Sequence, residues 1–71
     1  MTTTLLSVPD ISCEHCERAI KRALEPVTGV ATVEVDIPAH TVRVAFDESR
    51  VALESLEEIL AQEEYPVAGV L

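Results

Sequence analysis

The chain has 71 residues, a formal net charge of −8 and only five Lys or Arg residues. Nucleic acid is therefore an unlikely class of partner, because proteins bind phosphates with basic side chains. No apolar run approaches the roughly 20 residues that span a bilayer, so we expect no direct membrane insertion. A chain of this length forms one small domain, which buries about 60% of the surface that the unfolded chain exposes. We therefore expect a single domain over residues 1–71.

The first residues, MTTTLLS, have neither the basic opening nor the long apolar stretch of a secretory signal. We therefore expect a cytoplasmic protein. In that reducing compartment, a close pair of cysteines is more often catalytic or metal-binding than a structural disulfide.

The first half of the chain predicts a strand, a helix and a second strand. Residues 4–8, TLLSV, form an apolar run that Pro9 ends, because proline cannot donate to a sheet. Apolar residues then recur at three- and four-residue intervals, which predicts an amphipathic helix over about residues 14–25. Pro26 and Gly29 close that helix. Residues 30–37, VATVEVDI, alternate between apolar and polar as a half-buried strand does.

The second half predicts a hairpin, a second helix and a last strand. Residues 38–40 form a tight connection to the strand TVRVAF, residues 41–46. Ser49 is a candidate N-cap for an amphipathic helix that runs from about residue 53 to Glu64. The apolar end, PVAGVL, predicts a strand over residues 66–71. The residues that we expect in the core include Ile20, Val35, Val44 and Phe46.

The order βαββαβ predicts an α+β fold, the ferredoxin-like sandwich, with a four-stranded antiparallel sheet and two helices on one face. In the usual strand order of this fold, 4-1-3-2, the last strand lies beside the first. With strands about 4.8 Å apart, Tyr65 should lie next to the cysteine loop. His40 should lie roughly 10 Å to the side, as an ordinary hairpin residue.

Both cysteines stand in DISCEHC, residues 10–16, with Cys16 near the start of the predicted helix. Free N–H groups and the helix dipole favour a thiolate there, and thiolates bind metals or attack disulfides. A structural zinc site needs four protein ligands, whereas this chain has one cysteine pair and two scattered histidines. Cu(I) is soft and prefers thiolates, so two sulfurs suffice for it and a partner can supply a third.

The chain resembles the heavy-metal-associated domain family, and within it the bacterial copper chaperones of the CopZ type. The resemblance rests on DISCEHC, TGVATVEV and EEYPV, which match the family's CxxC loop, its GV before the second strand and its late aromatic residue. It implies a non-enzymatic carrier that binds Cu(I) through Cys13 and Cys16. It also implies delivery to the metal-binding domains of a copper-transporting P-type ATPase, or to a copper-responsive repressor.

The resemblance assigns roles to the residues around the pair. Tyr65 would shield the metal, and Ile11 would pack beneath the loop where the family commonly has Met. Ser12 favours Cu(I), because zinc-transporting relatives tend to have Asp at this position. Apart from the resemblance, His15 between the cysteines points to solvent, or it tunes the affinity or supplies a ligand in a metal-bridged dimer. The metal-free protein is expected to be a monomer. Glu64 replaces a Gly that is usual before the aromatic residue.

Other functions stay open at this point. The same cysteine pair would serve a thiol-disulfide oxidoreductase, although such chains are usually longer and have a cis-proline loop beside the motif. A zinc or mercury carrier of the same fold is a third possibility. The acidic residues after position 46 form either the solvated face of a helix or a docking surface for a basic patch on a partner.

Overall fold

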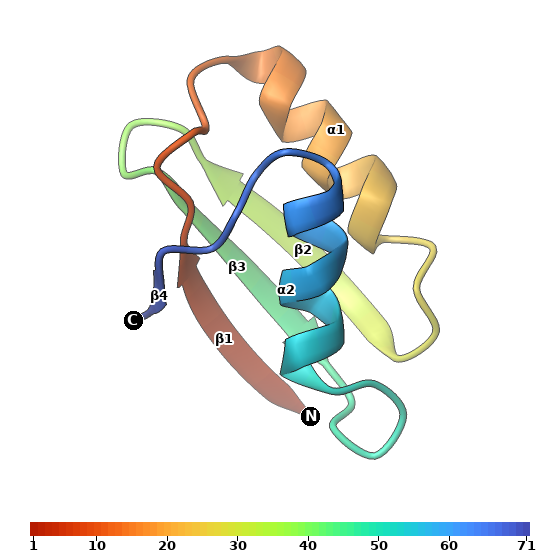
Figure 1. Ribbon diagram of the computed structural model, residues 1–71. Coiled ribbons are helices and arrows are strands. Elements are labelled where there is room, and N and C mark those ends of the chain that lie inside the picture. The colour runs from red at the N-terminus through yellow and green to blue at the C-terminus, as the bar shows by residue number, and fades with distance from the viewer.

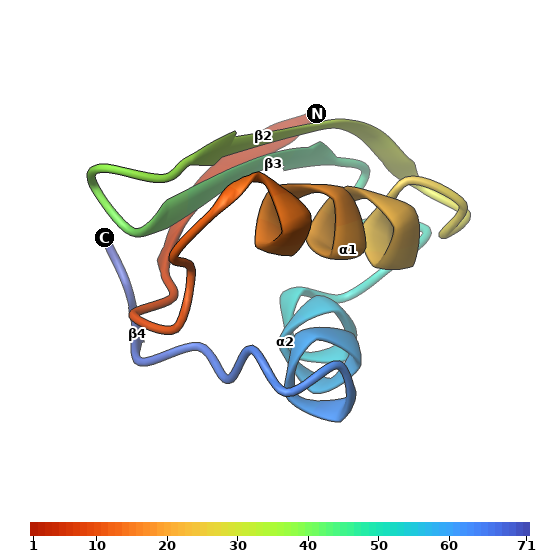
Figure 2. The ribbon, with the colours of Figure 1, turned by 90° about the horizontal axis from the view of Figure 1, so that it is seen from above.

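The computed structural model describes residues 1–71 and has the predicted element order βαββαβ. The strands are β1 (Thr2–Ser7), β2 (Val30–Asp36), β3 (Thr41–Phe46) and β4 (Gly69–Val70), and the helices are α1 (Glu14–Leu24) and α2 (Leu53–Gln62). The strands form one antiparallel sheet in the order β2-β3-β1-β4. Both helices lie on the same face of this sheet (Figures 1 and 2). The ferredoxin-like prediction is therefore confirmed.

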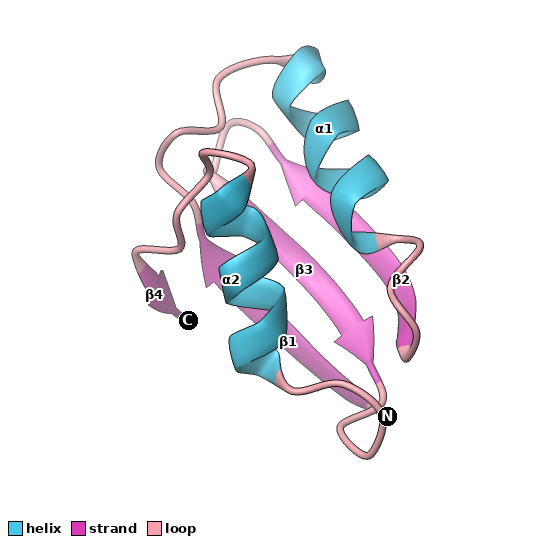
Figure 3. Ribbon diagram, turned by 45° about the vertical axis from the view of Figure 1, so that its right-hand side comes forward, coloured by secondary structure: helices cyan, strands magenta, loops and turns pink.

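The core lies between the sheet and the two helices, and α1 contacts both β2 and α2 (Figure 3). Its fully enclosed residues include Leu6, Ile11, Ile20, Leu24, Val44, Leu56 and Leu60. Of the residues predicted for the core, Ile20, Val44 and Phe46 are buried. Val35 is only partly buried and packs against the core from outside, near the end of the edge strand β2, whereas Val33 on the same strand is buried.

The last strand is much shorter than predicted. Only Gly69 and Val70 pair with β1, whereas the sequence predicted a strand over residues 66–71. Pro66 has no N–H to donate to a sheet, and Val67 packs against the core. The N–H groups of Ala68 and Leu71 nevertheless donate to β1 carbonyls over 2.8 Å, which extends the attachment on both sides of β4.

The predicted N-cap of the second helix is wrong. The Ser49 hydroxyl donates to Oδ1 of Asp47 over 2.7 Å, and the Ser49 N–H donates to the same oxygen over 3.0 Å. These two bonds hold the pKa of the Asp47 carboxyl below its usual value. Ser49 therefore stabilises the turn before the helix, a local alternative to capping that Ser and Asp often adopt. Ala52 occupies the N-cap position, without a side-chain hydrogen bond.

Neither helix has the length and apolar character that crossing a membrane requires.

Candidate metal site

The cysteine loop leaves the sheet through a tight turn. After β1, the Ile11 N–H donates to the Val8 carbonyl over 3.2 Å, and Pro9 and Asp10 form the turn between them. Pro9 suits the second position of such a turn, because its ring fixes φ near the required value. Ile11 is fully buried, so it returns the chain to the core. Ser12 and Cys13 then emerge at the surface.

Helix α1 begins at the first cysteine. Cys13 is the N-cap residue, with extended backbone angles, and its carbonyl accepts the N–H groups of Cys16 over 3.0 Å and of Glu17 over 3.3 Å. Cys16 therefore lies in the first helical turn, where N–H groups are free and the dipole favours negative charge. Cys13 is exposed, whereas only 8% of Cys16 is exposed, and both are free thiols.

The two sulfur atoms are 3.9 Å apart. A disulfide needs a distance of about 2.05 Å, so these sulfurs are not bonded to each other. A metal–thiolate bond is about 2.3 Å long in zinc sites, so one ion of similar size can join two sulfurs separated by up to about 4.6 Å. The observed separation therefore suits one metal ion held by both sulfurs.

Several donors converge on the Cys16 sulfur. The Tyr65 hydroxyl, followed by the Ser12 backbone N–H, lowers the pKa of the Cys16 thiol from 9.0 to about 6. The Ser12 hydroxyl also approaches this sulfur, at 3.8 Å, and the Asp10 carbonyl lies 4.0 Å from it. The partial burial of Cys16 opposes the shift but does not cancel it. The lowered pKa favours the thiolate form of this sulfur, the form that binds metal ions.

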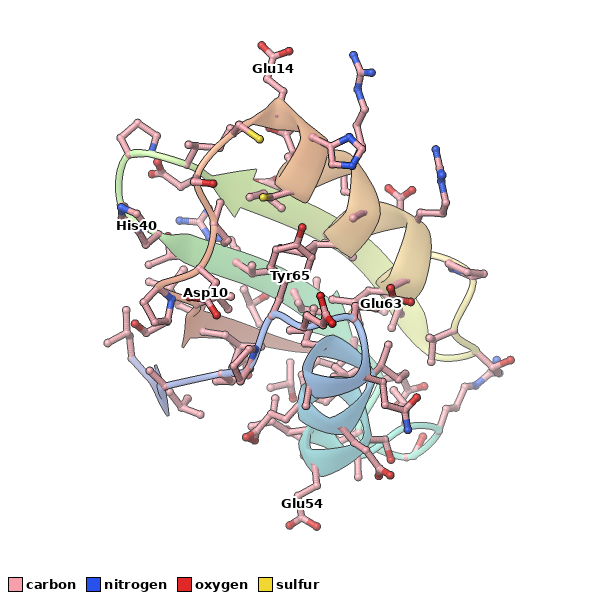
Figure 4. All side chains as sticks on the ribbon, turned by 45° about the horizontal axis from the view of Figure 1, so that its top comes forward. Asp10, Glu14, His40, Glu54, Glu63 and Tyr65 are labelled. Atoms are coloured by element: carbon pink, nitrogen blue, oxygen red, sulfur yellow. The ribbon has the colours of Figure 1, made fainter.

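The end of α2 positions Tyr65. The N–H of Glu64 donates to the Ala61 carbonyl over 3.1 Å, and the N–H of Tyr65 donates to the Leu60 carbonyl over 2.8 Å. These two bonds form a Schellman motif, with Glu64 in the left-handed region at φ 69°. Figure 4 shows Tyr65 pointing from this motif toward the start of α1. The interaction with Cys16 raises the pKa of the Tyr65 hydroxyl to about 12.

His15 lies between the two cysteines in sequence and is exposed in the first turn of α1. No group of three or more His, Cys, Asp or Glu side chains is arranged to hold a metal ion. His15 is therefore not assembled with the cysteines into a larger ligand set within one chain.

His40, at the end of the β2–β3 connection, contacts the residues that follow β1. Its Nδ1 is 3.2 Å from the Pro9 carbonyl, and its own carbonyl accepts the Val8 N–H over 2.8 Å. The sequence predicts a position for the hairpin beside the end of β2, two strands away from β1. His40 directly precedes β3, however, and β3 is the neighbour of β1. The hairpin therefore contacts the turn that leads into the cysteine loop.

The charges around the site are unevenly distributed. Arg18 and Arg22 of α1 are exposed and form no ion pair, whereas Lys21 pairs with Glu17 over 3.4 Å. The acidic side chains of α2 form no ion pairs with any basic residue: Glu54, Glu57 and Glu58. The first turn of α1 is acidic and its later turns are basic, whereas the charged residues of α2 are all acidic.

Comparisons with known proteins find one matching family and several similar sequences and structures. The sequence pattern of the heavy-metal-associated domain matches residues 5–66. The copper chaperone CopZ of Staphylococcus haemolyticus is 37% identical over 67 residues, which are 94% of this chain and 98% of the relative. A solved structure of a CopZ metallochaperone is 30% identical with a TM-score of 0.91, over 94% of this chain and 100% of the other. Oxidized MerP from Ralstonia metallidurans is 32% identical with a TM-score of 0.90, over 97% and 94% of the two chains.

Proposed function

Because the chain belongs to the heavy-metal-associated domain family, we propose that it is a cytoplasmic metallochaperone for Cu(I). Cys13 and Cys16 bind the ion as thiolates, and the protein passes it on by ligand exchange without catalysing a reaction. The observation that carries the proposal is the pair of free sulfurs 3.9 Å apart, one of them exposed and the other buried.

The asymmetry of the pair supports exchange with a partner. A thiolate of the acceptor approaches the ion on the side of Cys13, which is exposed, and forms a third copper–sulfur bond. The bond to Cys13 then breaks, and a second acceptor sulfur displaces Cys16 in the same way. Each bond that forms replaces one that breaks, and the copper stays Cu(I).

Tyr65 has two roles in this scheme. Its ring packs against the core at the edge of the site and limits the access of water to the ion. Its hydroxyl lowers the pKa of the Cys16 thiol, which favours the thiolate when the metal leaves. Cys16 is therefore the sulfur that the protein keeps ready for the next ion.

The partner class that we propose is the metal-binding domain of a copper-transporting P-type ATPase, with a copper-responsive repressor as a further acceptor. Such a partner must present its own pair of soft sulfurs, because Cu(I) favours thiolates over oxygen ligands. The unpaired Arg18 and Arg22 of α1 and the acidic surface of α2 would orient the partner, since complementary charge mainly sets encounter rate and orientation. A metal-bridged dimer of this chain is a possible storage form that uses the same exposed Cys13.

A thiol-disulfide oxidoreductase is the second candidate, and the lowered pKa of Cys16 favours it. In disulfide exchange, however, the attacking thiolate must reach its substrate, and here that sulfur belongs to the residue that is only 8% exposed. An insulin-reduction assay separates the candidates. Substantial turnover by the wild-type protein would favour the enzyme, and its absence would favour the carrier.

The proposed function is tested by a transfer experiment. The copper-loaded protein is mixed anaerobically with a metal-free domain that has its own CxxC pair, in the presence of a chromogenic Cu(I) chelator. We expect copper to move to the acceptor without passing through the coloured chelator complex. Transfer that occurs only through the chelator complex would contradict ligand exchange. The same mixing experiment with Zn(II) or Hg(II), and with a chelator suited to each metal, shows whether the protein also transfers these ions.

A further inference from the structure

The β2–β3 hairpin makes two hydrogen bonds to the turn that begins the cysteine loop. Its His40 accepts the Val8 N–H through the backbone carbonyl over 2.8 Å, and the Nδ1 atom of its ring lies 3.2 Å from the Pro9 carbonyl. A carbonyl oxygen only accepts hydrogen bonds, so this Nδ1 atom carries the proton. We propose that His40 is a positioning residue, which fixes the turn and thereby the place at which the two cysteines stand.

The turn is held at both of its central residues. The Pro9 carbonyl accepts from His40, and the Asp10 carbonyl lies beside the Cys16 sulfur, 4.0 Å away. The turn also closes on itself through the Ile11 N–H and the Val8 carbonyl. Ile11 is fully buried, so a shift of the turn would have to move a core residue. The contacts of the turn therefore fix the position of the cysteine loop. The hairpin provides one of these contacts through the ring of His40.

The backbone of His40 supports this role. His40 has a φ of 56°, in the left-handed region that costs non-glycine residues conformational energy. Gly or Asn would suit a simple hairpin turn at this position better. Strained backbone conformations persist where the surrounding structure holds a residue in place, often because its side chain has a role. At His40 the strain accompanies a ring that points at the Pro9 carbonyl.

Two variants separate the ring from the backbone. His40→Gly removes the ring and relieves the positive φ. His40→Asn also tolerates this φ, but it retains an N–H donor on a short side chain, near the position of Nδ1. Any difference between the two variants therefore reports on the side-chain hydrogen bond and not on backbone strain.

The measurement is amide hydrogen exchange in the reduced, metal-free protein. We expect His40→Gly to speed exchange of the Ile11 amide about fivefold, the effect of losing one hydrogen bond of typical net strength. The amides of β3 should keep their protection, and so should Val8, whose acceptor is the backbone carbonyl of residue 40. We expect His40→Asn to retain most of the Ile11 protection. Unchanged Ile11 exchange in His40→Gly, or equal loss in both variants, would overturn the proposal.

A second measurement connects the turn to the metal and rests on the proposed function. In competition with a chelator, His40→Gly should release Cu(I) several-fold more readily than the wild type, and His40→Asn should resemble the wild type. Equal release from all three proteins would show that the turn does not position the sulfurs. If the wild-type protein itself bound no copper, the proposed function would fail. The amide measurement in the metal-free protein would still decide the role of His40.

Discussion

The Tyr65 hydroxyl lowers the pKa of the Cys16 thiol, and Cys16 in turn raises the pKa of Tyr65, so the end of α2 is coupled to the first turn of α1. The two residues come from opposite halves of the chain, and the Schellman motif at the end of α2 fixes the direction of the tyrosine. This coupling favours the thiolate form of one sulfur of the pair in the metal-free protein. The first two predictions test this connection.

Replacing Tyr65 with Phe should raise the pKa of the Cys16 thiol from its value of about 6. Because hydrogen bonds to charged groups are comparatively strong, we expect a rise of about one to two pH units. The measurement is the rate of iodoacetamide alkylation against pH, in a Cys13→Ser background in which only Cys16 reacts. Phe keeps the ring and its packing, so the variant isolates the hydroxyl. An unchanged titration curve would contradict the assigned contact.

The stability of the metal-free protein should rise as the pH increases from about 6 to 9. Over this window the unfolded thiol still holds a proton that the folded Cys16 has released, so raising the pH favours the folded state. The contribution is complete above pH 9 and is lost as the pH falls through 6. Urea unfolding under reducing conditions measures it, and Cys16→Ala provides the control. If the rise persists unchanged in Cys16→Ala, its source lies elsewhere.

Replacing Glu64 with Gly should stabilise the protein by about 1 kcal/mol, since Gly adopts the left-handed conformation without the cost that other residues incur. Glu64 has a φ of 69° within the Schellman motif. Glu64→Ala is the matched control, because it removes the same charge but keeps a side chain at positive φ. Stabilisation by Ala as large as that by Gly would assign the effect to charge. Urea unfolding of the three proteins provides the comparison.

Ile11 should tolerate Met but not Ala. The side chain is fully buried beneath the loop, so Ile11→Ala leaves a cavity and should cost about 2–5 kcal/mol. Ile11→Met conserves volume and should cost less than about 1.5 kcal/mol. Chemical denaturation gives both values. A Met variant as unstable as the Ala variant would show that the shape of Ile11, and not only its volume, supports the loop.

The fold was predictable because its evidence is periodic and local. The helix α1 shows a repeat of apolar residues, β2 and β3 alternate, and prolines and glycines mark several of the ends. The position of Tyr65 beside the cysteine loop followed from strand order alone. Neither inference required the details of side-chain packing.

The features that were missed depend on competition between local hydrogen bonds. Serine is a common N-cap residue, but Ser49 hydrogen-bonds Asp47 and does not cap the helix. The apolar end of the chain predicts a strand over residues 66–71. Because of Pro66 and the packing of Val67 against the core, only Gly69 and Val70 pair with β1. His40 was placed from the wrong strand of its hairpin, so its contact with Pro9 was not anticipated. In each case the sequence gives the type of the residue, but it does not show which group that residue contacts.

The central claim is that Cys13 and Cys16 together hold one Cu(I) ion. Its most direct test is an anaerobic Cu(I) titration of the reduced protein against a competing chelator, with Cys13→Ser and Cys16→Ser as matched variants. We predict that the wild-type protein withdraws one equivalent of copper from the chelator and that each variant withdraws far less. A wild-type protein that fails to compete, or a Cys13→Ser variant that binds copper equally well, would contradict the claim.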